Sequence, residues 1–352
     1  MSTIPYKRHN KVLLIYTGGT IGMGRNTDTG ALEPLDFGHL IDNLPELRLV
    51  GTDVDVHVFS PAIDSSDMTP AHWRSIVEII SSRYANYDGF VVIHGTDTMA
   101  YTASALSYML ENLTKPVILT GSQLPIGQLR TDGKENLLTS IELAAAHNAD
   151  GTPRVPEVCI CFGGRLLRGN RSTKSTADGF AAFESYNYPH LCDAGVNFTF
   201  HDHHIMLPDY NRPMLPHFDM DSNVIVLSLF PGIQEGIIRH VLDSPVLRSI
   251  VLRSYGSGNA PQSPALFSLL KDASLRGVVI VNVSQCVSGA VEMGRYDSGY
   301  QLEQAGVISG RDSTVEAAVT KLMFLQALYH DSQRIREMMQ VSIAGEVTFL
   351  VE

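Results

Sequence analysis

Residues 11–20, KVLLIYTGGT, decide the fold of this 352-residue chain. Five apolar residues, 12–16, lead without a polar interruption into Thr-Gly-Gly-Thr. This pattern predicts a strand that is buried on both faces and ends in a glycine turn. Open α/β sheets bind ligands at the carboxyl ends of their strands, and adjacent glycines let a substrate approach the backbone closely. Thr20 is therefore a candidate nucleophile.

The turn that follows this strand has two other interpretations, a phosphate-binding loop and a simple strand terminator. A Walker loop requires a lysine followed by serine or threonine after its second glycine, whereas Thr20 is followed by Ile-Gly-Met. The residue types after Thr20 therefore do not fit a Walker-type nucleotide-binding loop. A catalytic role for Thr20 depends on partners elsewhere in the chain.

Strands and helices alternate after this turn. Strands are predicted at 53–60, 89–93, 116–119 and 158–162, and helices at about 70–87, 99–113 and 134–147. This alternation predicts right-handed βαβ crossovers and a parallel sheet, whose strands all end at one edge. Polar residues after the strands should converge there, and they are Thr20, Ser65, Thr96, Asp97 and Ser122. The polar segment 21–36 beside Thr20 is expected to be a mobile loop.

The length of the chain exceeds the usual size of one hydrophobic core. Residues 201–220 hold four histidines and three prolines without a helical period, which is typical of a linker. Beyond them, strands are predicted at 224–230, 249–253 and 277–283, followed by a largely helical tail at 313–339. We therefore predict an α/β protein with a larger N-terminal parallel-sheet domain (1–203), a linker (204–222) and a smaller C-terminal α/β domain (223–352).

Composition argues against several classes of partner. The chain has 26 Lys and Arg against 37 Asp and Glu, a net charge of −11, and no basic block, so nucleic acid and anionic membranes are poor partners. Neither a secretory signal nor a membrane-spanning apolar run is evident, so we expect a cytoplasmic protein. The four cysteines lack metal-binding spacing and are expected to be free, buried thiols. We interpret His201, His203 and His204 as linker residues rather than metal ligands.

A threonine nucleophile needs a base that takes its proton. His94 ends a predicted strand, but it is at least as well placed to hold its turn through a backbone hydrogen bond. The alternative is a lysine that acts through a hydroxyl: Asp97 holds the ammonium group while Thr96 passes the proton. Lys174 is the best-placed lysine, although a surface role in solubility remains open.

Other polar residues suit an amino-acid substrate. Ser65 and Ser66, with neighbouring backbone N–H groups, are suited to a carboxylate, and Asp97 or Asp64 to an α-amino group. The chemistry of the residues alone therefore indicates a hydrolase with a small, polar substrate.

Two motifs, YTGGTIG at 16–22 and HGTDTM at 94–99, resemble the signatures of the bacterial-type L-asparaginase family, and specifically its cytoplasmic type I branch. Further matching stretches lie at 64–70, 119–123, 168–171, 252–256, 258–261 and 282–286. The resemblance implies hydrolysis of L-asparagine to L-aspartate and ammonia through an acyl-enzyme on Thr20, without metal or cofactor. It makes Thr96, Asp97 and Lys174 the second catalytic group, with Asp97 also holding the substrate's amino group. Asp64, Ser65 and Ser66 would bind its carboxylate end.

The resemblance also implies a homo-oligomer, either a dimer or a dimer of dimers, in which Asn259 completes the partner's site. One departure concerns the loop at 21–36, where several relatives carry a tyrosine that assists the nucleophile. This loop has no tyrosine, and Ala31 takes its place. Either Thr27 or Thr29 substitutes, or the lysine relay suffices.

Type I enzymes of enteric bacteria are similar in having a separate, regulatory site for asparagine. The matching positions here are Thr173, Arg253, Ser254, Tyr255 and Cys286. Arg253 can pair bidentately with a carboxylate, so we expect a sigmoidal response to asparagine. The alternative is that Arg253 only braces the domain interface.

Three competing functions are a mixed glutaminase-asparaginase, an amidotransferase subunit that supplies ammonia to charged tRNA, and a non-catalytic amino-acid sensor. The additional methylene of glutamine discriminates by only about 1–3 kcal/mol, so glutamine is hard to exclude. The tRNA-linked subunit carries an extra N-terminal domain and is disfavoured by the negative charge. A sensor need not retain Thr20 together with Lys174, whose joint presence favours an enzyme.

Overall fold

The computed structural model of the chain describes residues 10–25, 32–34 and 45–349. Strand β1 (Lys11–Tyr16) lies between β4 (Asp53–Val58) and β5 (Gly89–Ile93) and is parallel to both. Its residues 12–16 are at most 2% exposed. The prediction of a strand buried on both faces is confirmed, because apolar residues on each side of β1 face a separate hydrophobic layer.

The large sheet has eight strands in the order β13-β12-β9-β8-β7-β5-β1-β4. Its parallel part continues from β5 through β7 (Val117–Thr120) to β8 (Val158–Phe162), and β4 forms the edge, as its alternating pattern indicates. Three antiparallel strands extend the sheet beyond the predicted set: β9 (Arg165–Arg168), β12 (Cys192–Ala194) and β13 (Phe198–Phe200). The chain reverses between β8 and β9 at Gly163 and Gly164, whose φ angles of 57° and 75° favour glycine.

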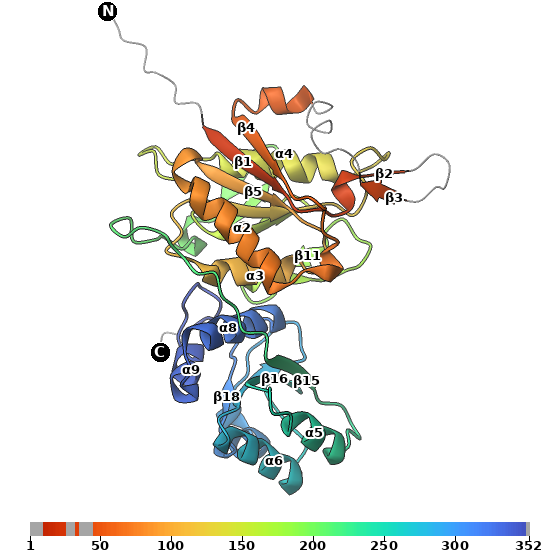
Figure 1. Ribbon diagram of the computed structural model, residues 1–352, viewed down its shortest axis with the longest axis vertical. Coiled ribbons are helices and arrows are strands. Elements are labelled where there is room, and N and C mark those ends of the chain that lie inside the picture. The colour runs from red at the N-terminus through yellow and green to blue at the C-terminus, as the bar shows by residue number, and fades with distance from the viewer. Residues whose placement is uncertain (1–9, 26–31, 35–44, 350–352) are drawn as a thin grey trace, which may run out of the picture.

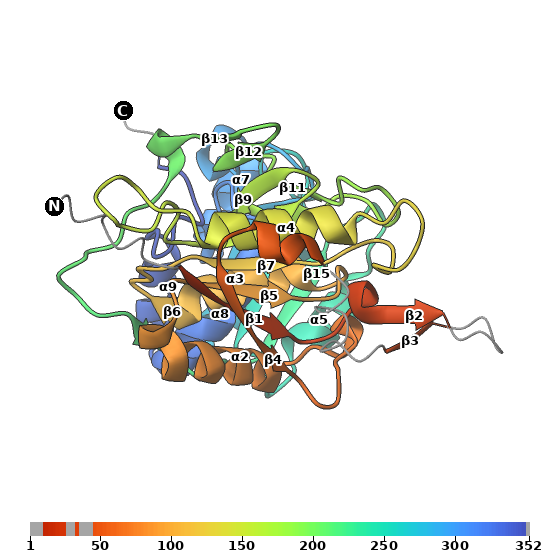
Figure 2. The same cartoon turned by 90° about the horizontal axis from the view of Figure 1, so that it is seen from above.

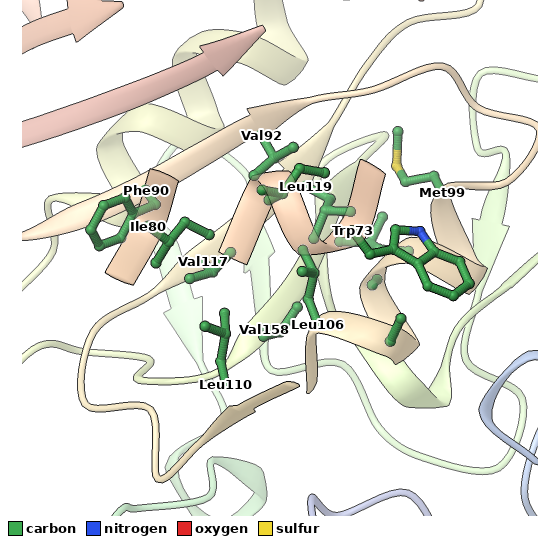
Figure 3. Close-up of a cluster of buried hydrophobic side chains, with 14 of the residues drawn as sticks. Trp73, Ile80, Phe90, Val92, Met99, Leu106, Leu110, Val117, Leu119 and Val158 are labelled. Carbon is green, nitrogen blue, oxygen red and sulfur yellow. The ribbon is translucent and has the colours of Figure 1, made fainter. Parts of the chain in front are cut away.

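Helices cover both faces of this sheet (Figure 2). On one face α2 (Pro70–Arg83) and α3 (Met99–Met109) enclose a cluster that includes Trp73, Phe90 and Leu106 (Figure 3). On the other face α4 (Gly133–Ala144) packs against residues of alternate strand positions. Helix α3 is shorter than predicted, because the chain leaves helical geometry at Leu110 and forms β6 (Leu110–Glu111), which pairs with β14 (Leu215–Pro216).

The C-terminal domain contains a four-stranded parallel sheet in the order β15-β16-β17-β18. The strands are β15 (Val224–Ser228), β16 (Ser249–Ser254), β17 (Val279–Ser284) and β18 (Val307–Ser309). One face packs against α5 (Glu235–Leu242), α6 (Pro264–Leu275) and α7 (Asp297–Gln304). The other packs against α8 (Val315–Leu328) and α9 (Ser332–Met339). The predicted two-domain α/β fold is therefore confirmed.

Helix α8 lies between the two domains (Figure 1). It contacts α3 of the larger domain and β15, β16 and β17 of the smaller domain. Nine of the ten residues from Ala317 to Gln326 are buried. This double contact explains why the sequence of α8 is apolar on nearly all sides rather than along one stripe.

The segment between Phe200 and Val224 contributes no strand to either large sheet. It contains a short 3₁₀ turn (Asp202–His204) and β14, and it is fastened to the larger domain. The Asn112 side chain accepts the N–H of Asp209 (2.9 Å) and donates to the carbonyl of Arg212 (2.7 Å). This connection is therefore ordered by specific hydrogen bonds despite its irregular sequence.

Among residues 10–25, 32–34 and 45–349, no group of three or more His, Cys, Asp or Glu side chains is arranged to hold a metal ion. In the same ranges, no helix combines the length and the apolar character needed to cross a membrane. Cys159, Cys161 and Cys192 are free and buried. The prediction of a buried thiol is wrong for Cys286, which is exposed because it lies in the turn after β17 rather than within a strand.

Candidate active site

Three loops meet backbone to backbone at the carboxyl edge of the large sheet. A Cβ atom at Gly18 would lie 2.1 Å from the carbonyl oxygen of Ile63, and one at Gly19 would lie 2.6 Å from the backbone nitrogen of Gly95. Both glycines also have positive φ, 142° and 95°. Since only glycine permits such an approach, the Thr-Gly-Gly-Thr turn brings the segments after β4, β1 and β5 together.

Thr20 begins a short 3₁₀ turn (Thr20–Gly22) directly after these glycines and is partly exposed. The turn is held by the buried Ile21 and by Gly22, where a Cβ atom would lie 2.2 Å from the hydroxyl oxygen of Tyr16. Strands β2 (Met23–Arg25) and β3 (Leu32–Pro34) follow as an antiparallel pair. The rest of the expected mobile loop, with Thr27, Thr29 and Ala31, lies outside the described residues.

The segment after β4 places Asp64, Ser65 and Ser66 beside this junction. Asp64 accepts the backbone N–H and the hydroxyl of Ser66, both at 2.9 Å. The backbone hydrogen bond, followed by that of the hydroxyl, lowers the pKa of the Asp64 carboxyl. Ser65 is buried against Gly95, where a Cβ atom would lie 2.5 Å from the Ser65 hydroxyl oxygen. The Ser65 hydroxyl therefore lies at the meeting point of two loops.

Lys174 reaches this edge from β10 (Thr173–Lys174), which pairs with β11 (Phe183–Glu184). Its Nζ donates to Asp97 Oδ1 at 2.6 Å and to Thr96 Oγ1 at 2.9 Å. The Lys174 side chain is 19% exposed and that of Asp97 is 65% exposed. The ammonium group is thus held between a carboxylate and a hydroxyl, with Asp97 open to solvent.

Gln123, in the loop after β7, was not singled out by sequence reasoning as a site residue. Its side-chain oxygen accepts a long hydrogen bond from Thr96 Oγ1 (3.4 Å), and its amide nitrogen donates to the carbonyls of Ala177 and Gly179. Gln123 thereby joins Thr96 to the loop that follows Lys174. Ser122, by contrast, donates to the carbonyl of Leu124 (2.6 Å) and closes its own turn.

His94 is buried beneath the junction and makes two hydrogen bonds. The Nδ1 atom lies 2.6 Å from the Gly95 carbonyl oxygen, which can only accept, so Nδ1 carries a proton. The Nε2 atom therefore accepts from the Thr102 hydroxyl (2.9 Å). The same hydroxyl accepts the indole N–H of Trp73. Burial lowers the pKa of His94 to about 4. Of the two interpretations of His94, the structure supports the one in which it holds its turn.

A second group of residues lies at the carboxyl edge of the small sheet. Arg253 and Ser254 end β16, Tyr255 follows them, and Cys286 lies two residues beyond β17. Three buried polar atoms here, Arg253 Nε, Ser254 Oγ and the Tyr255 hydroxyl, have no hydrogen-bond partner among the residues that the structure describes. Asn259 belongs to the same domain, where its side-chain oxygen accepts from Ser298 on α7 (3.1 Å).

Thr173 links the larger domain to helix α8. Its hydroxyl donates to Glu316 Oε1 at 2.6 Å. Burial raises the pKa of the Glu316 carboxyl, while the hydrogen bond from Thr173 and the charge of Arg253 oppose that rise. Thr173 and Lys174 therefore face opposite sides of the two-residue strand β10, one toward the smaller domain and the other toward Asp97.

Comparison with known proteins assigns the class. A family model described as "Asparaginase, N-terminal" matches residues 11–206, and one described as "Glutaminase/Asparaginase C-terminal domain" matches residues 223–339. The chain belongs to the asparaginase family and is a hydrolase that acts on amides. The resemblance inferred from the two sequence motifs is thus confirmed.

The chain is also similar to individual proteins and to a solved structure of this family. The chain is 46% identical to L-asparaginase 1 of Escherichia coli (strain K12), over 96% of this chain and 98% of that protein. The solved structure of L-asparaginase I from Vibrio cholerae is 42% identical, covers 97% of this chain and 100% of its own, and has a TM-score of 0.88. A Homo sapiens protein named 60 kDa lysophospholipase is 40% identical, over 96% of this chain and 61% of its own length.

Proposed function

We propose that the chain is an L-asparagine amidohydrolase that releases L-aspartate and ammonia. The observation that carries this proposal is the contact of Lys174 Nζ with Asp97 and Thr96, on a loop that touches the glycine turn bearing Thr20. The similarity to proteins named L-asparaginase supports the choice of asparagine.

In the proposed reaction the Thr20 hydroxyl attacks the carbon of the side-chain amide, and its proton passes to a basic group. Collapse of the tetrahedral intermediate breaks the C–N bond; the nitrogen takes up a proton and leaves as ammonia. The resulting ester on Thr20 is hydrolysed by water, which regenerates the hydroxyl and releases aspartate. Lys174 and Thr96 carry the protons, while Asp97 fixes the lysine.

Substrate recognition follows from the same junction. Asp64, Ser65 and Ser66 bind the carboxylate end of the amino acid, and Asp97, with its exposed carboxylate, also binds the α-amino group. Thr27, Thr29 or the lysine relay alone takes the place of a loop tyrosine in activating Thr20. No metal and no cofactor takes part in this scheme.

We further propose that the protein is a cytoplasmic homo-oligomer, a dimer or a dimer of dimers, in which Asn259 completes the site of a partner. A second asparagine site at Thr173, Arg253, Ser254, Tyr255 and Cys286 regulates the first. The unpartnered buried atoms of three of these residues favour a ligand at that edge.

The direct test is ammonia release by wild-type and Thr20→Ala protein, with L-asparagine and L-glutamine titrated separately. We expect wild type to prefer asparagine and Thr20→Ala to be inactive while still binding asparagine. Comparable rates on both amides would favour the mixed glutaminase-asparaginase. Binding of asparagine by wild type without ammonia release would favour the amino-acid sensor. Release of fatty acid from a lysophospholipid, without ammonia release from asparagine, would overturn the proposed amidohydrolase and its regulation by asparagine.

A further inference from the structure

The segment that follows α9 returns from the smaller domain to the larger one. Three successive carbonyls of this segment accept hydrogen bonds from the turn at residues 168–171. Asn170 donates to the carbonyl of Ala344 (2.7 Å), Arg168 to that of Gly345 (3.3 Å) and Arg171 to that of Glu346 (2.8 Å). The C-terminal segment 342–348 therefore fastens the turn that leads into Lys174, and we call this set of contacts the clasp.

Two buried ion pairs hold this clasp in place. Arg171 Nη2 lies 2.9 Å from Asp312 Oδ2, with side chains 1% and 11% exposed. Lys321 Nζ on α8 lies 2.5 Å from Glu346 Oε1, with side chains 2% and 1% exposed. Removing one member of such a pair leaves a charge buried and uncompensated, so other arrangements of these groups are strongly disfavoured.

Glu346 joins the two pairs. Its carboxylate binds Lys321 and accepts the backbone N–H of Ala344 (2.8 Å), while its carbonyl accepts from Arg171. The hydroxyl and the backbone N–H of Thr348 add two more hydrogen bonds around Arg171 and Asp312. Thr348 accepts from Arg171 through its hydroxyl and donates its N–H to Asp312 (2.8 Å).

The residues before Lys174 are all held through side chains. Ser172 donates to the carbonyl of Arg168 (2.7 Å), and Thr173 donates to Glu316 on α8. Lys174 is the next residue, and its side chain turns toward Asp97. The backbone position from which the Lys174 side chain extends is therefore held on two sides, by the pairing of β10 with β11 and by groups of the smaller domain.

We propose that Arg171, with Asp312 and the C-terminal segment 342–348, is a positioning residue for Lys174. This inference rests on the proposed function, in which Lys174 carries protons. A shift of the Lys174 backbone lengthens the Nζ contacts to Thr96 and Asp97, and misplacements of about 1 Å can cost roughly a hundredfold in rate. The proposed substrate-binding residues, Asp97 after β5 and residues 64–66 after β4, lie on loops outside the clasp, so substrate binding does not depend on it.

The test compares Asp312→Asn with Asp221→Asn. Both aspartates accept an arginine and a backbone N–H: Asp312 binds Arg171 and Thr348, and Asp221 binds Arg248 (2.6 Å) and Asn223 (3.0 Å). Asp221 also accepts the side-chain amide of Asn223 (2.7 Å). Only the first arginine belongs to the turn before Lys174. Thr348→Val, which removes the hydroxyl that accepts from Arg171, serves as a milder variant if Asp312→Asn does not fold.

We expect Asp312→Asn to lower kcat for asparagine about tenfold or more with little change in KM, because positioning acts on the reacting geometry. Asp221→Asn should retain kcat within about twofold even if its melting temperature falls, since it alters a matched pair away from the site. Hydrogen exchange at residues 170–175 should be faster only in Asp312→Asn. On a Lys174→Met background, Asp312→Asn should cause no further loss of kcat.

Equal kcat in the two aspartate variants, or losses that multiply on the Lys174→Met background, would overturn the positioning role while leaving the proposed function intact. Full activity of Lys174→Met would instead remove the catalytic role of Lys174, and the positioning role with it. The two failures are therefore distinguishable.

Discussion

The parallel strands of both large sheets end in polar residues, but those residues are paired at one edge and unpaired at the other. At the edge of the eight-stranded sheet, polar groups bind each other across loops: Lys174 binds Asp97 and Thr96, and Thr96 binds Gln123. At the edge of the four-stranded sheet, buried polar atoms of Arg253 and Ser254 have no hydrogen-bond partner within the described part of the chain.

We interpret this difference as one between a proposed active site that is already organised and a proposed second site that a ligand or partner completes. Paired charges hold the proposed catalytic groups in place before substrate arrives, as electrostatic preorganisation requires. A buried polar atom without a partner costs about 1–3 kcal/mol, which a ligand or a second subunit can recover. The comparison therefore predicts large kinetic effects at the first edge and small, binding-linked effects at the second.

The largest effect is expected for Lys174→Met. Because Lys174 carries protons in the proposed reaction, its loss should lower kcat for asparagine about 10²–10⁴-fold, with a smaller change in KM. Lys271→Met, on the exposed surface of α6, is the control and should have wild-type kinetics. Steady-state ammonia release measures both variants. A Lys174→Met enzyme with wild-type kcat would contradict the interpretation of the paired groups at the large-sheet edge as a preorganised active site.

Gly19→Ala and Gly256→Ala compare the backbone at the two edges. The Gly19 Cβ would collide with the Gly95 backbone, whereas Gly256, with φ of 50°, has no atom within 4 Å of such a Cβ. We expect Gly256→Ala to cost about 1–2 kcal/mol from its backbone conformation and Gly19→Ala about 3 kcal/mol or more. Urea denaturation measures both; equal losses would mean that the three-loop junction tolerates expansion.

The first edge should also weaken in acid through His94. Because its folded pKa, about 4, lies below the ordinary value of 6.5, the unfolded chain binds the proton more tightly. Stability from the neutral imidazole is present above pH 6.5 and is lost as the pH falls toward 4. Between pH 7 and pH 5 the unfolding free energy should fall about 2 kcal/mol more in wild type than in His94→Asn, which cannot titrate there.

Arg253→Ala should have the smallest effect. We expect its kcat at saturating asparagine to stay near the wild-type value, while the sigmoidal response becomes hyperbolic and half-saturation shifts by about fivefold. Arg295→Ala, an exposed arginine in the same domain, is the control. A hyperbolic wild-type curve that Arg253→Ala leaves unchanged would favour the brace interpretation of Arg253.

Much of the fold could be predicted because apolar runs such as residues 12–16 mark buried strands directly. Strands β9, β12 and β13 could not, since each has only three or four residues and none shows a long periodic pattern. The contact between Thr173 and Glu316 spans 143 residues and depends on how two domains meet. Local sequence patterns hold no information on such a contact, and Lys174 was chosen mainly by its place after a strand and by family resemblance.

The double burial of α8 has a consequence for synthesis of the protein. During translation the larger domain is complete long before residues 315–328 emerge, so the outer surface of α3 stays uncovered until the last part of the chain is made. Exposed apolar surface on such an intermediate favours aggregation and chaperone binding. Nascent chains that end before α8 should therefore associate with chaperones more strongly than the full-length protein does.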